Sequence, residues 1–192
     1  MEIKDFVGVY INQLKGLLDE IDPSVIVKIV ESFELTLKTG GRIYVLGNGG
    51  SSATASHIAN DFGPGLRRRG IANFDVVSLG DNAPVVTAIA NDIGYENIFY
   101  MQLEGLLQPQ DIILAISCSG DSPNIIKAVD YAKKIGSTVI GATGFSGGKL
   151  MQVADIVFHV NAKDGEYGLV EDVHMILDHI MYSYYVQRGS NA

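Results

Sequence analysis

Short apolar runs alternate with longer segments of helix length along most of this chain. The apolar runs are rich in aliphatic and β-branched residues and are predicted to be strands; they cover residues 42–46, 74–79, 111–116, 138–142 and 156–160. The predicted helices between them cover residues 52–62, 83–92, 122–135 and 148–153. Strands that are apolar almost throughout and alternate with helices are typical of a parallel sheet covered on both faces. We therefore expect an α/β fold, a doubly wound five-stranded parallel sheet flanked by helices.

Two helices are predicted before the first strand, within residues 1–40. The first carries a narrow apolar seam made of Ile3, Phe6, Val7, Tyr10, Leu14, Leu17 and Ile21. Such a seam packs against another helix. The partner lies either on the same domain or, as we favour, on a second subunit, because a terminal helix with a long seam needs a partner surface. Asp22 and Pro23 start the second helix as its cap and first helical residue, and Gly40 ends it.

We expect one domain over residues 1–192, because no linker, repeat or low-complexity segment interrupts the pattern. Residues 1–40 would serve in packing or oligomerisation, and residues 41–192 would form the sheet and its covering helices. The last long helix is predicted from Glu166 to about Gln187, and it contains His174 and His179.

Composition and charge exclude several classes of protein. Hydrophobic residues make up 47% and charged residues 19% of the 192, which is typical of a globular chain. The formal net charge of −8 argues against a nucleic-acid or membrane-surface binder, and the basic cluster Arg67-Arg68-Arg69 is too short to change that. No apolar run approaches the roughly 18 residues that span a bilayer, and the N-terminus lacks a signal-peptide core. With Cys118 as its only cysteine, the chain cannot form an internal disulfide, and we expect a cytoplasmic protein.

Two loops rich in glycine and serine connect predicted strands to predicted helices. GNGGSS follows the strand at 42–46, and SCSGDSPN follows the strand at 111–116. Ligands of parallel sheets bind outside the carboxyl ends of the strands, and the free N–H groups of a first helical turn favour an anion. We expect Ser119, Ser122 and the backbone around Gly120 to hold a phosphate, although a single loop of this kind can also be a plain capped turn. Neither loop has the G-x-x-x-x-G-K-[ST] or G-x-G-x-x-G pattern, so no nucleotide cofactor is expected.

Two helices carry histidine and carboxylate residues at spacings that place them on one face. His57 and Asp61 are four residues apart, and Glu171 and His179 are eight apart. Two imidazoles and two carboxylates suit a zinc ion, and they also suit the base and acid that move a proton between adjacent carbons of a sugar. The alternative for His57 and Asp61 is a simple surface pair. His174 is interpreted as structural or as a surface residue.

The chain resembles a known family through three segments and its last helix. GNGGSSATASHIANDF, AIANDIGY and ISCSGDSPNIIKAV, together with the histidine-bearing helix at the end, resemble the sugar isomerase (SIS) domain over nearly the whole chain. Within that family they are most similar to the sedoheptulose 7-phosphate isomerases, also called phosphoheptose isomerases. The resemblance implies an aldose–ketose isomerase that converts sedoheptulose 7-phosphate into D-glycero-D-manno-heptose 7-phosphate by acid–base proton transfer. It also implies a homo-oligomer, a tetramer, whose sites are completed across subunits.

The same resemblance implies roles for individual residues. In the family, four positions bind one zinc ion per site; here they are His57, Asp61, Glu171 and His179. The positions of Asp61 and His179 are the proposed base and acid. The family has a longer glutamate at Asp61 and a neutral glutamine at Glu171, so we expect Asp61 to remain a ligand while Glu171 takes over part of the acid–base work. The expected substrate-binding residues lie in the two loops and in a polar pair at the mouth of the pocket; they are Asn48, Gly49, Gly50, Ser51, Asn91, Asp92, Ser117, Cys118, Ser119 and Ser122.

Two other functions remain open at this point. Some SIS proteins bind sugar phosphates without converting them, and VVTAIAND resembles one such relative, an adaptor of the bacterial replication initiator. That adaptor lacks a histidine at the position of His179; a protein of its kind would show no aldose–ketose interconversion and need no metal. A sugar-responsive transcription regulator would need an additional helix-turn-helix domain, for which no segment of this chain is spare.

Overall fold

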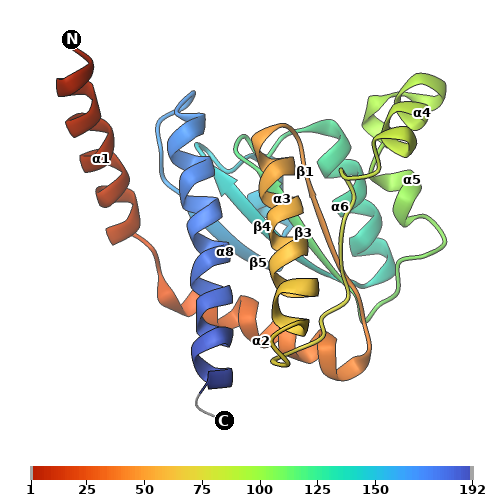
Figure 1. Cartoon of the computed structure of the whole chain (residues 1–192). Coiled ribbons are helices and arrows are strands. Elements are labelled where there is room, and N and C mark those ends of the chain that lie inside the picture. Colours follow the sequence, from red (N-terminus) through yellow and green to blue (C-terminus); the bar gives the residue numbers. More distant parts are fainter. Residues whose placement is uncertain (1, 191–192) are drawn as a thin grey trace.

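The computed structural model describes residues 2–190 of the chain. Its centre is one sheet of five parallel strands in the order β2-β1-β3-β4-β5 (Figure 1). The strands are β1 (Ile43–Gly47), β2 (Val76–Ser78), β3 (Ile112–Ser117), β4 (Thr138–Gly144) and β5 (Ile156–Val160). From β1 the chain adds β2 on one side and then β3, β4 and β5 on the other, so the topological switch point lies between β1 and β3. A doubly wound sheet opens its ligand crevice at this point. The α/β fold with five parallel strands, expected from the sequence, is confirmed.

Helices cover both faces of this sheet. One group consists of α2 (Pro23–Thr39), α3 (Gly50–Asn60) and α8 (Tyr167–Ser190), and the other of α5 (Tyr100–Leu103), α6 (Pro123–Ile135) and α7 (Gly148–Val153). Side chains alternate along each strand, so Val45 of β1 packs with the first group while Leu46 packs with the second. The remaining helices, α1 (Ile3–Asp19) and α4 (Ala83–Ile93), lie at opposite sides of the molecule (Figure 1). Among the described residues, no helix is both long and apolar enough to cross a bilayer.

The predicted elements lie within a few residues of the observed ones. β5 and α7 have the predicted bounds, whereas β2 is shorter than predicted because only Val76–Ser78 pairs with β1. The helix predicted at 52–62 is α-helical up to Asn60 and continues as a π-helical turn, Asp61–Gly65, which contains Pro64. Proline has no N–H to donate to the regular α-helical ladder. The 3₁₀ turn Tyr95–Asn97 and the short α5 were not predicted.

α2 begins and ends where its capping residues indicate. Asp22 accepts a hydrogen bond from the N–H of Ser24 at 2.9 Å, and Pro23 is the first helical residue. Gly40 adopts the left-handed conformation with φ 71°, and its N–H bonds back to the carbonyl of Leu37. These are the usual N-terminal and C-terminal caps of a helix, so the sequence prediction for α2 is confirmed.

α1 carries its apolar seam on a surface that the rest of the chain covers only in part. No residue of α1 is buried, and Ile3 and Phe6 are exposed near its start. Nearer its end, Leu14 packs against the core. Tyr10 donates a hydrogen bond to Asp172 of α8 at 2.7 Å, which fixes α1 beside α8 (Figure 1). The first part of the seam, at Ile3, Phe6 and Val7, is therefore exposed.

Candidate functional site

The two glycine- and serine-rich loops lie side by side. β1 and β3 are neighbours, and Gly47 at the end of β1 pairs in register with Ile116 near the end of β3, so both loops leave the same edge of the sheet. Asn48 Nδ2 donates to Asn124 Oδ1 at 3.0 Å, and Asn124 Nδ2 donates to Asn48 Oδ1 at 2.8 Å. This pair of hydrogen bonds fixes the first loop against the first turn of α6.

A pocket of about 170 Å³ lies between the loops. Its lining residues come from both loops, from the end of β3 and from the start of α8; they are Asn48, Ser51, Ile116, Ser117, Cys118, Ser119, Ser122, Tyr167 and Glu171. Six of the predicted substrate-binding residues are among them. None of these lining residues is a lysine or an arginine, so an anion bound here would be held by hydroxyl and N–H donors.

Serine hydroxyls surround the start of α6. The N–H of Gly120 donates to Ser117 Oγ at 3.1 Å, and Ser117 Oγ lies 3.4 Å from Ser122 Oγ. Gly120 has φ 69°, and a Cβ at this position would overlap the carbonyl group of Gly147. Only glycine fits such a turn without strain. Together with Ser119, these hydroxyls stand at the N-terminus of a helix of 13 residues, an arrangement that suits a phosphate group.

Glu171 reaches the pocket from α8 because Gly50 leaves room for it. A Cβ at Gly50 would overlap the carboxylate of Glu171, so the carboxylate rests against the first residue of α3. The N-terminus of a helix is electropositive, which favours a carboxylate there. Gly49, with φ 55° and ψ −123°, turns the chain into α3. Glu171 is the only carboxylate among the residues that line the pocket.

The predicted polar pair Asn91 and Asp92 does not line this pocket. Both residues are exposed near the end of α4, where Asn91 Nδ2 donates to Asp92 Oδ1 at 2.8 Å. A residue that the sequence analysis missed connects this region to the loops instead: the hydroxyl of Tyr95 donates to Asn48 Oδ1 at 2.9 Å. The sequence could have indicated Tyr95 only by its position, because it directly follows Gly94, the residue that ends α4.

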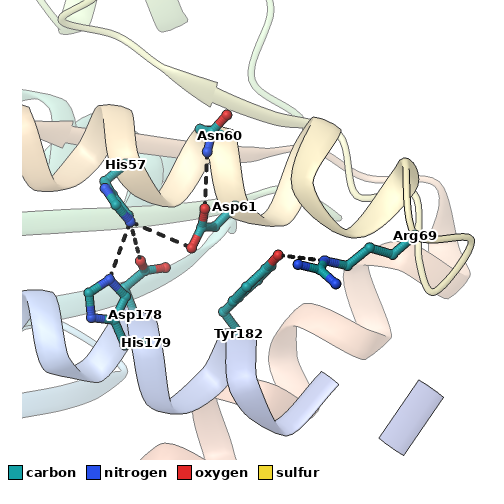
Figure 2. Close-up of polar contacts among 7 residues, drawn as sticks. All are labelled: His57, Asn60, Asp61, Arg69, Asp178, His179 and Tyr182. Carbon is teal, nitrogen blue, oxygen red and sulfur yellow. Dashed lines mark hydrogen bonds and ion pairs between the residues drawn. The ribbon is translucent and has the colours of Figure 1, made fainter. Parts of the chain in front are cut away.

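A second group of polar residues lies farther along α3 and α8 (Figure 2). The donor atoms of four residues all lie within 4.8 Å of one another; they are His57, Asp61, Asp178 and His179. Separations from His57 Nε2 are 3.3 Å to His179 Nε2, 3.5 Å to Asp61 Oδ2 and 3.6 Å to Asp178 Oδ2. We call these four residues the His–Asp cluster. It joins the end of α3 and the following π-helical turn to the middle of α8.

Asp178 is the buried member of the His–Asp cluster. Its side chain is 0% exposed, whereas that of His57 is 42% exposed. Among the described residues, neither carboxylate oxygen of Asp178 has a hydrogen-bond partner. Burial and the nearby carboxylate of Asp61 raise the pKa of Asp178 to about 7. A divalent cation would satisfy these oxygens, and a donor set of two imidazole nitrogens and two carboxylates fits such an ion.

Three of the four residues expected to bind zinc therefore meet in the cluster, and the fourth, Glu171, lies in the pocket. Seven residues, about 10 Å along the helix axis, separate Glu171 from Asp178. Asp178 was missed in the sequence analysis. The sequence could have indicated Asp178 by its position on α8. It follows Val173 and Leu177 on the buried apolar face of the helix, where a carboxylate is unusual.

His174 has a structural environment. It is buried, and its Nε2 lies 3.2 Å from the carbonyl oxygen of Thr143 in β4. Burial lowers the pKa of His174 to about 4, so its imidazole is neutral and Nε2–H donates to that oxygen. The structural interpretation of this residue fits its surroundings, and the surface interpretation does not.

Comparison with known proteins agrees with this architecture. The family model of the SIS domain matches residues 9–144. A curated relative named phosphoheptose isomerase, from Thermodesulfovibrio yellowstonii, is 38% identical over 158 residues, which are 82% of this chain and 77% of that protein. Another of the same name, from Roseiflexus sp., is 35% identical over 180 residues, which are 87% of this chain and 90% of that one. The solved structure of a phosphoheptose isomerase from Neisseria gonorrhoeae has a TM-score of 0.84 at 26% identity and covers 96% of this chain and 97% of that chain.

Proposed function

Because this chain belongs to the SIS domain family, we propose that it is an aldose–ketose isomerase that converts sedoheptulose 7-phosphate into D-glycero-D-manno-heptose 7-phosphate. Relatives with 38% and 35% identity to it are phosphoheptose isomerases by name, and so is the similar solved structure. One observation of the molecule itself carries the proposal. The two serine-rich loops converge on a pocket that is also lined by the carboxylate of Glu171.

We assign the phosphate of the substrate to the second loop. Ser119 and Ser122 line the pocket at the N-terminus of α6. Hydroxyl and N–H donors backed by the helix dipole can hold a phosphate without a basic side chain. Such local donors agree with a chain whose formal net charge is −8. Asn48 and Ser51 of the first loop are then available to the sugar hydroxyls.

The reaction moves a proton between C1 and C2 of the sugar. A base removes a proton from C1 of the ketose while the C2 carbonyl oxygen gains one, which gives a 1,2-enediol. Return of a proton to C2 and loss of the proton on O1 then give the aldose. We assign Glu171 as the base, because it is the carboxylate of the pocket. Asp61 and His179, expected as base and acid, are assigned first to a cation, since they lie in the His–Asp cluster.

We propose that the His–Asp cluster holds a zinc ion, with His57, Asp61 and His179 among its ligands. Imidazole nitrogens and carboxylates are common zinc ligands, and their spacing here is short enough for one ion. A bound zinc ion would polarise a carbonyl group if one coordination position stayed open, and would fasten the elements that carry its ligands if all positions were filled by protein. The same three residues join the end of α3 and the π-helical turn after it to α8, the helix that carries Glu171.

We further propose a cytoplasmic homotetramer in which residues 1–192 form one SIS domain per subunit. The exposed half of the α1 seam, with Ile3 and Phe6, supports assembly because such an apolar patch suits a second copy. Residues 1–40 would then serve this assembly as well as packing. The single cysteine, Cys118, supports a reducing compartment. The acidic charge supports neither nucleic acid nor an anionic membrane as a partner.

The function is tested by incubating the purified protein with sedoheptulose 7-phosphate in D₂O, with and without zinc. We expect the aldose in the NMR spectrum with deuterium at C2, because the enediol takes its hydrogen from groups that exchange with solvent. Glu171→Gln should lower kcat at least about 100-fold, the range for a lost general base, without changing the circular dichroism spectrum. Ser122→Ala should raise KM through the lost phosphate contact. A folded wild-type protein that makes no aldose in the presence of zinc would refute the proposal.

The same experiment separates the alternative, a sugar-phosphate-binding protein without activity. Such a protein would be stabilised against heat by sedoheptulose 7-phosphate but would take up no deuterium. The position of His179 favours the enzyme, because its Nε2 lies 3.3 Å from His57 Nε2 inside a cluster that suits a metal.

A further inference from the structure

We propose that Asp178 is the fourth protein ligand of the zinc ion, so that Glu171 serves the substrate pocket and not the ion. The inference rests on the zinc site proposed above and concerns which carboxylate of α8 completes it. Asp178 and Glu171 are seven residues apart and thus face nearly the same side of the helix. The two residues lie at different positions along the axis of α8, and only Asp178 lies beside His57.

The separations from His57 Nε2 to the other three members of the His–Asp cluster agree with a tetrahedral set of ligands. Four donors at about 2.0–2.2 Å from one zinc ion lie about 3.3–3.6 Å from one another. From His57 Nε2, the separations are 3.3, 3.5 and 3.6 Å, and the last of these is to Asp178 Oδ2. For these three pairs, α3 and α8 need no rearrangement to bind the ion.

The burial of Asp178 supports the same role independently. Its side chain is 0% exposed, and neither oxygen has a hydrogen-bond partner among the described residues. Buried carboxylates in proteins are normally hydrogen-bonded, ion-paired or bound to a metal. An ion pair with a protonated His57 is the simpler alternative, but a half-exposed imidazole at 3.6 Å leaves both oxygens without a hydrogen bond. A cation among the four side chains satisfies Asp178 directly.

Glu171 cannot take the same place in this fold. Two helical turns, about 10 Å, separate it from Asp178 along α8. Its carboxylate lies against Gly50 and lines the substrate pocket. The charge of a divalent ion is already balanced by the carboxylates of Asp61 and Asp178. The zinc site therefore requires no contribution from Glu171.

A shell of four protein ligands determines what the ion does. Structural zinc sites have four protein ligands, whereas catalytic sites keep one position open. With Asp178 bound, the ion fastens the end of α3 and the π-helical turn Asp61–Gly65 to α8. Because α8 also carries Glu171, the ion stabilises the helix that presents the base. We therefore expect zinc to raise the melting temperature of the protein.

Zinc affinity of matched variants tests the inference. Wild type, Asp178→Asn, Asp178→Leu and Glu171→Gln are titrated with zinc against a chromophoric chelator, and each is melted with and without zinc. Both Asp178 variants should lose at least about 100-fold in zinc affinity, since even residues behind the ligands contribute 10–100-fold. They should also lose the rise in Tm, whereas Glu171→Gln should keep both. Asparagine matches aspartate in size, and leucine has the same branched shape with apolar atoms that suit a buried position. One of the two variants can therefore give the result if the other fails to fold.

Each remaining outcome overturns a stated part of the proposal. If both Asp178 variants keep their zinc affinity, the ligand assignment is wrong, whether or not Glu171→Gln loses affinity, while the isomerase function stands. If Glu171→Gln and the Asp178 variants lose affinity equally, Glu171 is not free of the ion. If wild type binds no zinc, both this inference and the zinc site fail, and turnover of sedoheptulose 7-phosphate remains a separate result.

Discussion

Replacement of Gly50 by alanine tests whether Glu171 acts from the position that the structure shows. Gly50 is the first residue of α3, and a Cβ there would lie closer than 3.0 Å to the carboxylate of Glu171, a separation that real Cβ atoms essentially never show. An ordinary contact needs about 3.5 Å or more, so the carboxylate must withdraw by roughly 1 Å. A misplacement of about 1 Å can lower a rate about 100-fold, and we expect kcat to fall by about that factor.

The stability of Gly50→Ala should not fall. The group that must move is the end of a flexible side chain, and Gly50 does not have a positive φ. Alanine also favours a helix over glycine by up to about 1 kcal/mol. We therefore expect the free energy of unfolding in urea to stay unchanged or to rise slightly, so that a loss of kcat cannot be attributed to unfolding.

Glu171→Ala supplies the matched background for this test. If Gly50→Ala acts only by displacing the carboxylate of Glu171, the double variant should have the same kcat as Glu171→Ala alone. Turnover of sedoheptulose 7-phosphate, followed by NMR, measures all three variants. An unchanged kcat in Gly50→Ala, or a further loss in the double variant, would show that Glu171 does not act from this position.

Three further predictions concern α8 and the loops. The pKa of His174 is lowered to about 4 from 6.5, so the unfolded chain binds the proton more tightly and stability is lost as the pH falls from about 6.5 towards 4. Between pH 7 and 5, wild type should lose about 2 kcal/mol more of unfolding free energy than His174→Gln, and equal losses in urea titrations would disprove this. Gly120→Ala should lower Tm and abolish sugar-phosphate binding in calorimetry, because φ 69° and the carbonyl of Gly147 leave no room for a Cβ; an unaltered Tm would contradict it. Tyr95→Phe removes a hydrogen bond to Asn48 worth about 1 kcal/mol; it should raise KM several-fold and lower Tm by no more than about 2–4 °C, and an unchanged KM would contradict it.

Apolar patterns predicted the elements of the sheet well because they report burial. All residues of β1 and β3 are buried, and both strands were found from their continuous apolar runs. The same signal misjudged the length of β2, since Phe74 and Leu79 are buried but only Val76–Ser78 pairs with β1. Burial and ladder hydrogen bonding are separate properties, and only the first can be read from hydrophobicity. The short α5, Tyr100–Leu103, spans about one turn, too little for a helical period to appear.

The pocket was predictable from topology, but the composition of the His–Asp cluster was not. Loops that follow parallel strands meet at one edge of the sheet, and this brings Asn48 of the first loop next to the second loop, which follows β3. Helical spacing, in contrast, gives the face on which a residue lies. It does not give the position of that residue along the axis relative to a neighbouring helix. His57 and His179 are 122 residues apart in sequence, and the core beneath α3 and α8 sets the level at which they meet. With α3 and α8 in this relative position, Glu171 lies against Gly50 and outside the His–Asp cluster.

Asp61 and Asp178 are best understood as a pair. Asp61 is one methylene shorter than the glutamate of the isomerases that the sequence resembles, which withdraws its carboxylate by about 1.5 Å. Asp178 supplies a second carboxylate from the facing helix, 3.6 Å from His57 Nε2. Two carboxylates balance a divalent ion, so a third is not needed there, and Glu171 can keep its place against the first turn of α3. On this argument, a chain with glutamine in place of Glu171 would still hold the ion through Asp178 but would lack the base in the pocket.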